Sequence, residues 1–79
     1  MAAMESNQPV KMTRIDSSTV AAVGYDSGDR CLYVRFTEGR GTYVYYDVPT
    51  MLFEELLAAE SKGRFLNERL KGSYRYQKV

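Results

Sequence analysis

Alternating apolar and polar residues in the first half of the chain predict three β-strands. The runs Val20–Tyr25, Cys31–Thr37 and Thr42–Val48 are rich in valine, tyrosine and phenylalanine, which favour extended backbone. Asp26–Asp29 and Glu38–Gly41 separate these runs, and both segments consist of residues that tolerate turn dihedrals. Because parallel strands need a crossover of about a dozen residues or more, the short connections predict an antiparallel meander.

The apolar period changes after Val48 and becomes helical. Large apolar residues recur at the spacing of one helix face, and these are Leu52, Phe53, Leu56 and Leu57. The acidic residues Glu54, Glu55 and Glu60 fall outside this face. Pro49 suits the first helical position, where its missing N–H leaves no bond unmade. We therefore predict a first helix over about residues 50–60.

A second, shorter helix is expected after Gly63. This glycine is expected to end the first helix in a left-handed cap, as glycine commonly does. The second helix runs until Gly72, and its inward face carries Phe65, Leu66 and Leu70. Residues 73–79 alternate between polar and apolar side chains, which indicates an extended tail or a short edge strand.

Together these elements predict an α+β fold, a three-stranded antiparallel β-meander followed by two short α-helices packed on one face. Residues 1–14 show neither apolar period and are expected to form a disordered N-terminal tail. Residues 15–79 then form a single domain. Its predicted core consists of Leu32, Val34, Phe36, Leu52, Phe53, Leu56, Leu57, Phe65, Leu66 and Leu70.

The face of the sheet that Tyr43 and Tyr45 occupy depends on the length of the second hairpin loop. A loop of two or four residues centred on Gly39-Arg40 places Tyr43 beside Phe36 and Tyr45 beside Val34, on the face that the helices cover. A three-residue loop over Gly39–Gly41 turns both rings to the open face, because a slip of one residue inverts every side chain. The residues are compatible with both alternatives.

Length and cysteine content limit the kind of protein further. The chain has 79 residues, one cysteine and no histidine, so it supports one small domain without a disulfide framework or a usual zinc site. We expect no metal and no other cofactor. A free Cys31 thiol fits a reducing compartment, and nothing in the chain approaches the ~20 apolar residues of a membrane span. The protein is therefore expected to be cytoplasmic, with no membrane partner.

Several short motifs resemble the KTSC family, which occurs at the C-terminus of some lysyl-tRNA synthetases and as stand-alone bacterial proteins. The resemblance runs from Ser17 to the C-terminus, although the segment from Phe36 to Tyr43 is one residue longer than the usual pattern. Its motifs are Ser17-Ser18, Tyr25-Asp26, the alternating Leu32, Val34 and Phe36, Tyr43-Val44-Tyr45, Val48-Pro49, residues 59–67 and Tyr74. The link to a synthetase implies RNA binding, by association only.

Charge is distributed unevenly along the chain. The net charge is +1, but residues 62–79 carry six basic residues and one acidic residue, against five and nine in residues 1–61. Basic side chains for phosphates and aromatic rings for bases are typical of a nucleic-acid surface. The candidate residues for binding RNA or single-stranded nucleic acid are Arg64, Arg69, Lys71, Arg75, Tyr43 and Tyr45.

A second candidate site lies between the two predicted helices. Ser61, Lys62 and Gly63 precede the second helix, whose free N–H groups are suited to hold an anion. The structural alternative is that Gly63 supplies a positive φ and that Ser61 accepts an N–H bond. Both interpretations are compatible with each other.

We expect no enzymatic activity. A hydroxyl nucleophile such as Ser17 or Ser18 needs a base, and the chain has no histidine to supply one. These serines more readily cap a turn before the first strand. The alternative function is a protein-interaction or self-association module, which would use an open sheet face with Cys31 and Tyr33 or a free edge strand.

Overall fold

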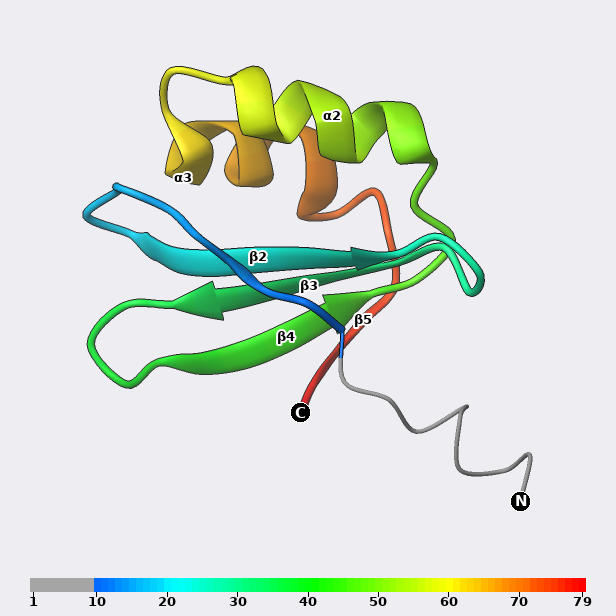
Figure 1. The fold of residues 1–79 in the computed structure, drawn as a ribbon, viewed down its shortest axis with the longest axis horizontal. Coiled ribbons are helices and arrows are strands. Elements are labelled where there is room, and N and C mark those ends of the chain that lie inside the picture. The colour runs from blue at the N-terminus through cyan, green and yellow to red at the C-terminus, as the bar shows by residue number, and fades with distance from the viewer. Residues whose placement is uncertain (1–9) are drawn as a thin grey trace.

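Residues 10–79 are described by a computed structural model, in which helices cover one face of an antiparallel sheet (Figure 1). The α+β fold is therefore confirmed, but the sheet of the described residues has five strands and not three. In chain order the elements are β1 (Thr13–Arg14), β2 (Val20–Asp26), β3 (Cys31–Phe36), β4 (Gly41–Tyr45), α2 (Thr50–Ala58), α3 (Lys62–Phe65), the π-helical turn η1 (Leu66–Leu70) and β5 (Tyr76–Lys78).

The additional strands β1 and β5 lie at the two edges of the sheet. The strand order is β1-β2-β3-β4-β5, and every neighbouring pair is antiparallel. The short edge strand expected near the C-terminus is β5. Thr13 and Arg14 were expected in the tail, but they pair with Val23 and Ala22 of β2. The rest of that prediction, over residues 1–9, lies outside the described residues.

The segment just before β1 crosses the sheet face opposite the helices, at Gly24. A Cβ atom added to Gly24 would stand 2.7 Å from the Lys11 carbonyl oxygen and 2.7 Å from Met12 Sδ. Only a residue without a side chain admits this approach. Part of the face that we expected to be open is therefore covered by residues 10–12, which have no recognisable apolar pattern.

The core lies between the other sheet face and the helices, as predicted. Its buried residues are Val20, Val23, Leu32, Val34, Tyr45, Val48, Leu52, Leu56, Leu66 and Leu70. Phe36, Phe53 and Phe65 pack against this cluster and are half-buried. Leu57 was wrongly placed in the core: it is 42% exposed, because α2 buries only the narrow stripe of Leu52 and Leu56.

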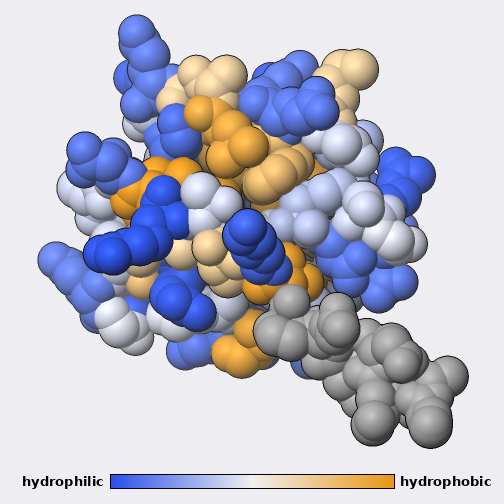
Figure 2. Space-filling view, viewed as in Figure 1, coloured by the Kyte–Doolittle hydropathy of each residue, from blue (hydrophilic) through white to orange (hydrophobic). Residues whose placement is uncertain are grey.

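The outer surface is mostly hydrophilic where Figure 2 views it, with apolar residues visible in patches between charged ones. Two of the most exposed large apolar side chains, Met51 and Leu57, belong to α2. Of the helices in residues 10–79, none combines the length and the apolar character that a membrane crossing requires.

The pairing of β3 with β4 decides between the two hairpin alternatives. Val34 lies opposite Tyr43, Leu32 opposite Tyr45, and Phe36 opposite Gly41, so the connecting loop has four residues, 37–40. The loop contains Glu38 and Gly39 with φ of 60° and 70°. Tyr43 and Tyr45 therefore stand on the helix-covered face, and the three-residue alternative is wrong.

The connection between α2 and the second helix differs from the predicted glycine cap. Gly63 lies inside α3 and is not among the described residues with positive φ. Its role is to permit close packing, because an added Cβ would lie 3.1 Å from Thr19 Cβ. The predicted capping by serine is confirmed twice, since Ser61 Oγ accepts the Arg64 N–H and Ser17 Oγ accepts the N–H groups of Thr19 and Val20.

Candidate functional site

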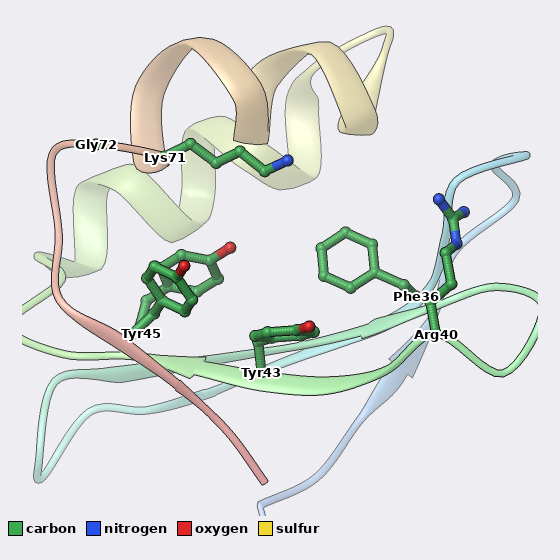
Figure 3. A pocket seen from close by; sticks show the side chains of 7 residues that line it. Phe36, Arg40, Tyr43, Tyr45, Lys71 and Gly72 are labelled. Carbon is green, nitrogen blue, oxygen red and sulfur yellow. The ribbon is translucent and has the colours of Figure 1, made fainter.

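A hollow of about 400 Å³ opens between the sheet and the end of η1 (Figure 3). We call it the aromatic hollow. It is lined by Phe36, Arg40, Tyr43, Tyr45, Lys71 and Tyr76, which come from β3, the β3–β4 loop, β4, the residue after η1, and β5. Pairing across β3, β4 and β5 brings the rings together, because directly opposed residues share one sheet face.

Aromatic rings form the floor and one side of this hollow. The Tyr43 ring meets the Phe36 ring edge to face, with centroids 5.6 Å apart and planes at 77°. Tyr76 lies against both Tyr43 and Tyr45, at centroid distances of 5.9 and 5.6 Å. Tyr76 is 58% exposed, so its ring is the one most accessible to a ligand.

A second hollow of about 330 Å³ adjoins the first and shares Phe36, Arg40 and Lys71 with it. We call it the polar hollow, because its other side chains include the hydrogen-bonding groups of Thr19, Ser61, Arg64 and Asn67. The two hollows together form a groove. Arg40, Arg64 and Lys71 place three positive charges along this groove, and none of the residues from 10–79 that line it is acidic.

Arg40 is held in a fixed position at the junction of the two hollows. Its Nε donates to the Thr37 carbonyl at 3.1 Å, and its Nη2 donates to Thr37 Oγ1 at 3.0 Å and to the Thr19 carbonyl at 3.4 Å. The guanidinium lies 6.0 Å from the Phe36 ring centroid. Within residues 10–79 its Nη1 group has no hydrogen-bond partner, so two of its N–H donors remain for an anion.

Lys71 enters the groove from the opposite wall. The π-helical turn ends with a bond from the Lys71 N–H to the Leu66 carbonyl at 3.0 Å, and the side chain then extends over the aromatic hollow (Figure 3). Among the described residues, its ammonium group has neither a hydrogen-bond partner nor a carboxylate partner. Arg40 and Lys71 therefore present uncompensated positive charge from two sides of the groove.

Of the other predicted cations, Arg69 and Arg75 do not line the groove with Lys71. Arg69 forms an ion pair with Glu55 at 2.9 Å and lies 5.1 Å from the Phe65 ring centroid, so it ties η1 to α2. The Arg75 guanidinium lies 5.7 Å from the centroid of the Tyr46 ring, and the Tyr46 backbone N–H donates to the Arg75 carbonyl. Only Arg64 reaches the polar hollow, and it has Glu68 at 3.9 Å.

The two predicted stacking tyrosines line the groove but are not freely exposed. Tyr43 is half-buried, and Tyr45 is only 3% exposed, so a base cannot lie flat on Tyr45 without displacing its neighbours. Burial, and to a smaller extent Tyr76 and Tyr43 nearby, raises the pKa of the Tyr45 hydroxyl above its ordinary value of 10.0. Tyr45 thus supports the hollow from beneath.

The predicted anion site has few free donors. The Arg64 N–H is bound by Ser61 Oγ at 3.2 Å, and the Phe65 N–H by the Ser61 carbonyl at 3.0 Å. The Lys62 ammonium donates to the Ala59 carbonyl. Ser61 and Gly63 nevertheless line the polar hollow. These residues therefore contribute to the groove and not to a separate pocket.

Arg40, Phe36 and Tyr76 were not among the predicted site residues. Phe36 was assigned to the core and Arg40 to a turn, where arginine carries no signal of its own. The sequence indicates a binding role for Tyr76 only through the alternation of Tyr74 and Tyr76 with basic residues. The four-residue loop brings Arg40 beside Phe36, and the sequence alone did not predict this contact.

The opposite sheet face offers less apolar surface than expected. Cys31 is buried there, and burial, with Asp29, Asp26 and Asp47 nearby, raises the pKa of its thiol above the ordinary value of 9.0. A thiol of this kind is a poor nucleophile and metal ligand. In residues 10–79, no three His, Cys, Asp or Glu side chains gather as a metal ion requires.

Comparison with known proteins assigns the fold to a family. The model of the KTSC domain matches residues 16–74. The crystal structure of a KTSC domain protein from Yersinia pestis has a TM-score of 0.85 and 32% sequence identity, covering 90% of this chain and 99% of that chain. A protein of Tsukamurella paurometabola is 48% identical over 64 residues, which are 81% of this chain and 94% of the relative.

A more distant match connects the chain with a synthetase. The lysine–tRNA ligase of Trichormus variabilis is 31% identical over 64 residues, which are 81% of this chain but only 11% of the ligase. The similarity is thus to a small part of that enzyme, whereas the first two relatives are matched over nearly their whole length. Because the family model matches most of the chain and these two relatives are covered almost completely, the chain belongs to the KTSC domain family.

Proposed function

We propose that this protein is a non-catalytic module that binds single-stranded nucleic acid, RNA in particular, in the groove between the sheet and η1. The observation that carries the proposal is the lining of the groove: aromatic rings beside Arg40, Arg64 and Lys71, and, among residues 10–79, no acidic residue in the lining itself. Rings stack on bases and cations neutralise phosphates, and single-strand binding proteins combine the two.

The dimensions of the groove favour an unpaired strand over a duplex. A hollow of 400 Å³ is at the lower end of the range of about 300–1,000 Å³ for ligand sites, which suits one base. Bases within an RNA duplex are stacked in the helix interior, whereas unpaired bases can splay out against aromatic side chains. The half-buried Tyr43 and exposed Tyr76 offer such surfaces.

The preference for RNA rests on relatives. A ligase whose name states that it joins lysine to tRNA contains a region similar to this chain. That region is a small part of the ligase, so an accessory contact with RNA is a more suitable role for it than catalysis. The same role in the present chain requires no base or nucleophile, in agreement with the absence of histidine from the sequence.

The alternative, an interaction or self-association module, has less support. One of its two grounds, beside the open sheet face, was free edges at the first and third predicted strands, which are β2 and β4, and these pair with β1 and β5. The outer strands β1 and β5 have two and three residues. Short edge strands disfavour pairing with another chain.

The proposal is tested by titrating the protein into fluorescently labelled single-stranded RNA and following anisotropy at ~50 mM salt, where electrostatic binding is strong. Arg40→Ala is expected to weaken binding several-fold. Arg35→Ala is the matched control, because Arg35 is exposed on the opposite sheet face. If three cations each contact one phosphate, the log–log slope of affinity against salt is about −2, since each contact on a single strand contributes about −0.7.

Two outcomes contradict the proposal. One is the absence of measurable RNA or DNA binding at this salt concentration. The other is an equal effect of Arg35→Ala and Arg40→Ala, which indicates diffuse attraction without a site. Concentration-dependent mass by light scattering, in place of RNA binding, favours self-association.

A further inference from the structure

Two uncharged polar side chains of the polar hollow, those of Thr19 and Asn67, have no hydrogen-bond partner among residues 10–79. Within residues 10–79, neither the Thr19 hydroxyl nor the Asn67 side-chain amide forms a hydrogen bond. Ser61 Oγ accepts the Arg64 N–H, which leaves its own O–H to donate. Thr19 precedes β2 and Asn67 belongs to η1, so separate elements bring these groups to one place.

Gly63 keeps the space beside Thr19 open. A Cβ at position 63 would lie 3.2 Å from Thr19 Oγ1 and 3.1 Å from Thr19 Cβ. Any side chain at this position therefore crowds the hydroxyl. The absence of one lets α3 approach β2 while the Thr19 hydroxyl remains part of the lining of the hollow.

We propose that the polar hollow holds the ribose and phosphate of the nucleotide next to the stacked base, and that Asn67 and Thr19 hydrogen-bond to the ribose 2′-hydroxyl. This inference rests on the proposed function and adds a physical basis for selecting RNA over DNA. Since the two hollows share Phe36, Arg40 and Lys71, a strand can pass from one to the other without leaving the groove.

The chemistry of the lining matches a ribose better than a second base. The cations Arg40, Arg64 and Lys71 supply the charge that a phosphate requires. The remaining polar side chains are the hydroxyls of Thr19 and Ser61 and the amide of Asn67, and each of these groups can both donate and accept a hydrogen bond. A 2′-hydroxyl likewise donates and accepts, and it is the group by which proteins distinguish RNA from DNA.

The test compares single-stranded RNA with DNA of the same sequence, containing uracil in place of thymine, against four variants. In the unmodified protein RNA is expected to bind about fivefold tighter, the value of roughly one net hydrogen bond. Asn67→Ala and Thr19→Val are expected to remove most of this preference by weakening RNA binding alone. Lys71→Ala should weaken RNA and DNA alike, because phosphates are common to both. Gln77→Ala, which removes an amide from the other sheet face, should change neither.

The outcomes separate this inference from the proposed function. Equal affinity of the unmodified protein for RNA and DNA overturns the ribose contact but leaves single-strand binding intact. Equal loss of RNA and DNA binding in Asn67→Ala does the same. Failure to bind either nucleic acid overturns both proposals. Circular dichroism spectra of each variant, compared with those of the unmodified protein, exclude loss of folding as the cause.

Discussion

Tyr43 on β4 lies opposite Val34 on β3, on the sheet face that the helices cover. Its ring packs against Phe36 and Tyr76 and at the same time lines the aromatic hollow. One side chain therefore supports the fold and forms part of the proposed binding surface.

Tyr43→Ala is expected to lower both stability and RNA affinity. Aromatic pairs contribute about 0.5–1.5 kcal/mol each beyond the area they bury, so a loss of about 2 kcal/mol or more is expected. Tyr76→Ala removes a ring that is 58% exposed and should lower affinity with a smaller change in stability. Urea unfolding and anisotropy titration of both variants measure the two effects. A stable Tyr43→Ala protein with unchanged affinity contradicts the described geometry.

Two adjacent leucines in α2 provide a matched test of the core. Leu56 is fully buried, and Leu56→Ala should cost about 2–5 kcal/mol of unfolding free energy. Leu57 is 42% exposed, and Leu57→Ala should cost less than about 1 kcal/mol. Thermal melting of the two variants decides the helix phase. Equal melting temperatures would show that the phase is wrong.

Gly24→Ala tests the contact with residues 10–12. The added Cβ meets backbone and sulfur atoms at 2.7 Å, so the segment must shift, at a cost of about 1–3 kcal/mol. In a chain that begins at Ile15 the same substitution should cost much less, because its contacts are gone. Urea unfolding of the four combinations yields the coupling between them. Equal costs in both chains mean that the segment does not occupy this face in solution.

Arg69→Ala tests the pairing that removes Arg69 from the proposed site. Its ion pair with Glu55 is half exposed, so the loss of stability should be below about 1 kcal/mol. RNA affinity should stay within about twofold of the unmodified protein, since Arg69 does not line the groove. The same titration that measures Lys71→Ala provides this value. A loss as large as that of Lys71→Ala places Arg69 in the interface.

Alkaline pH should destabilise the protein through Tyr45. Burial raises the pKa of its hydroxyl in the folded state, whereas the unfolded value stays near the ordinary 10.0. A raised pKa means that the stabilising contribution is complete below the unfolded pKa and is lost as the pH rises above it. Urea midpoints at pH 8 and 10.5 should therefore differ. Tyr45→Phe should reduce this difference, though not abolish it, because the pKa values of Tyr33 and Cys31 are also raised.

The longer elements could be predicted because their patterns extend over several residues. Strands β2, β3 and β4 and helix α2 each turn one face to the core between sheet and helices, and the two- and 3.6-residue periods indicate which residues lie on it. Strand β1 has only two residues, too few for any period to appear, whereas the alternation of residues 73–79 allowed β5 as one of two alternatives. Pairing with β2 and β4 makes them strands, and such pairing is not visible in the local sequence.

The candidate site was predicted less completely because it depends on packing between distant segments. Lys71 and Tyr43 were expected at the site and do line it, but Arg69 has a carboxylate partner on α2. That partner lies in another element and has no regular spacing from Arg69. Gly63 is a similar case: its absent side chain reflects the proximity of Thr19 rather than a turn.

The strand pairs β1–β2, β2–β3 and β3–β4 are each connected by a short loop, over residues 15–19, 27–30 and 37–40. Short loops lose little entropy on closing, and chains dominated by local contacts fold rapidly. The pairing of β5 with β4 is expected to form more slowly, because residues 46–75, including both helices, separate the two strands. We therefore expect Tyr76 to reach its place late in folding, and we expect the short edge strand that carries it to open more easily than β2, β3 and β4. On this expectation the aromatic hollow, which Tyr76 lines, forms late in folding and opens before the central strands separate.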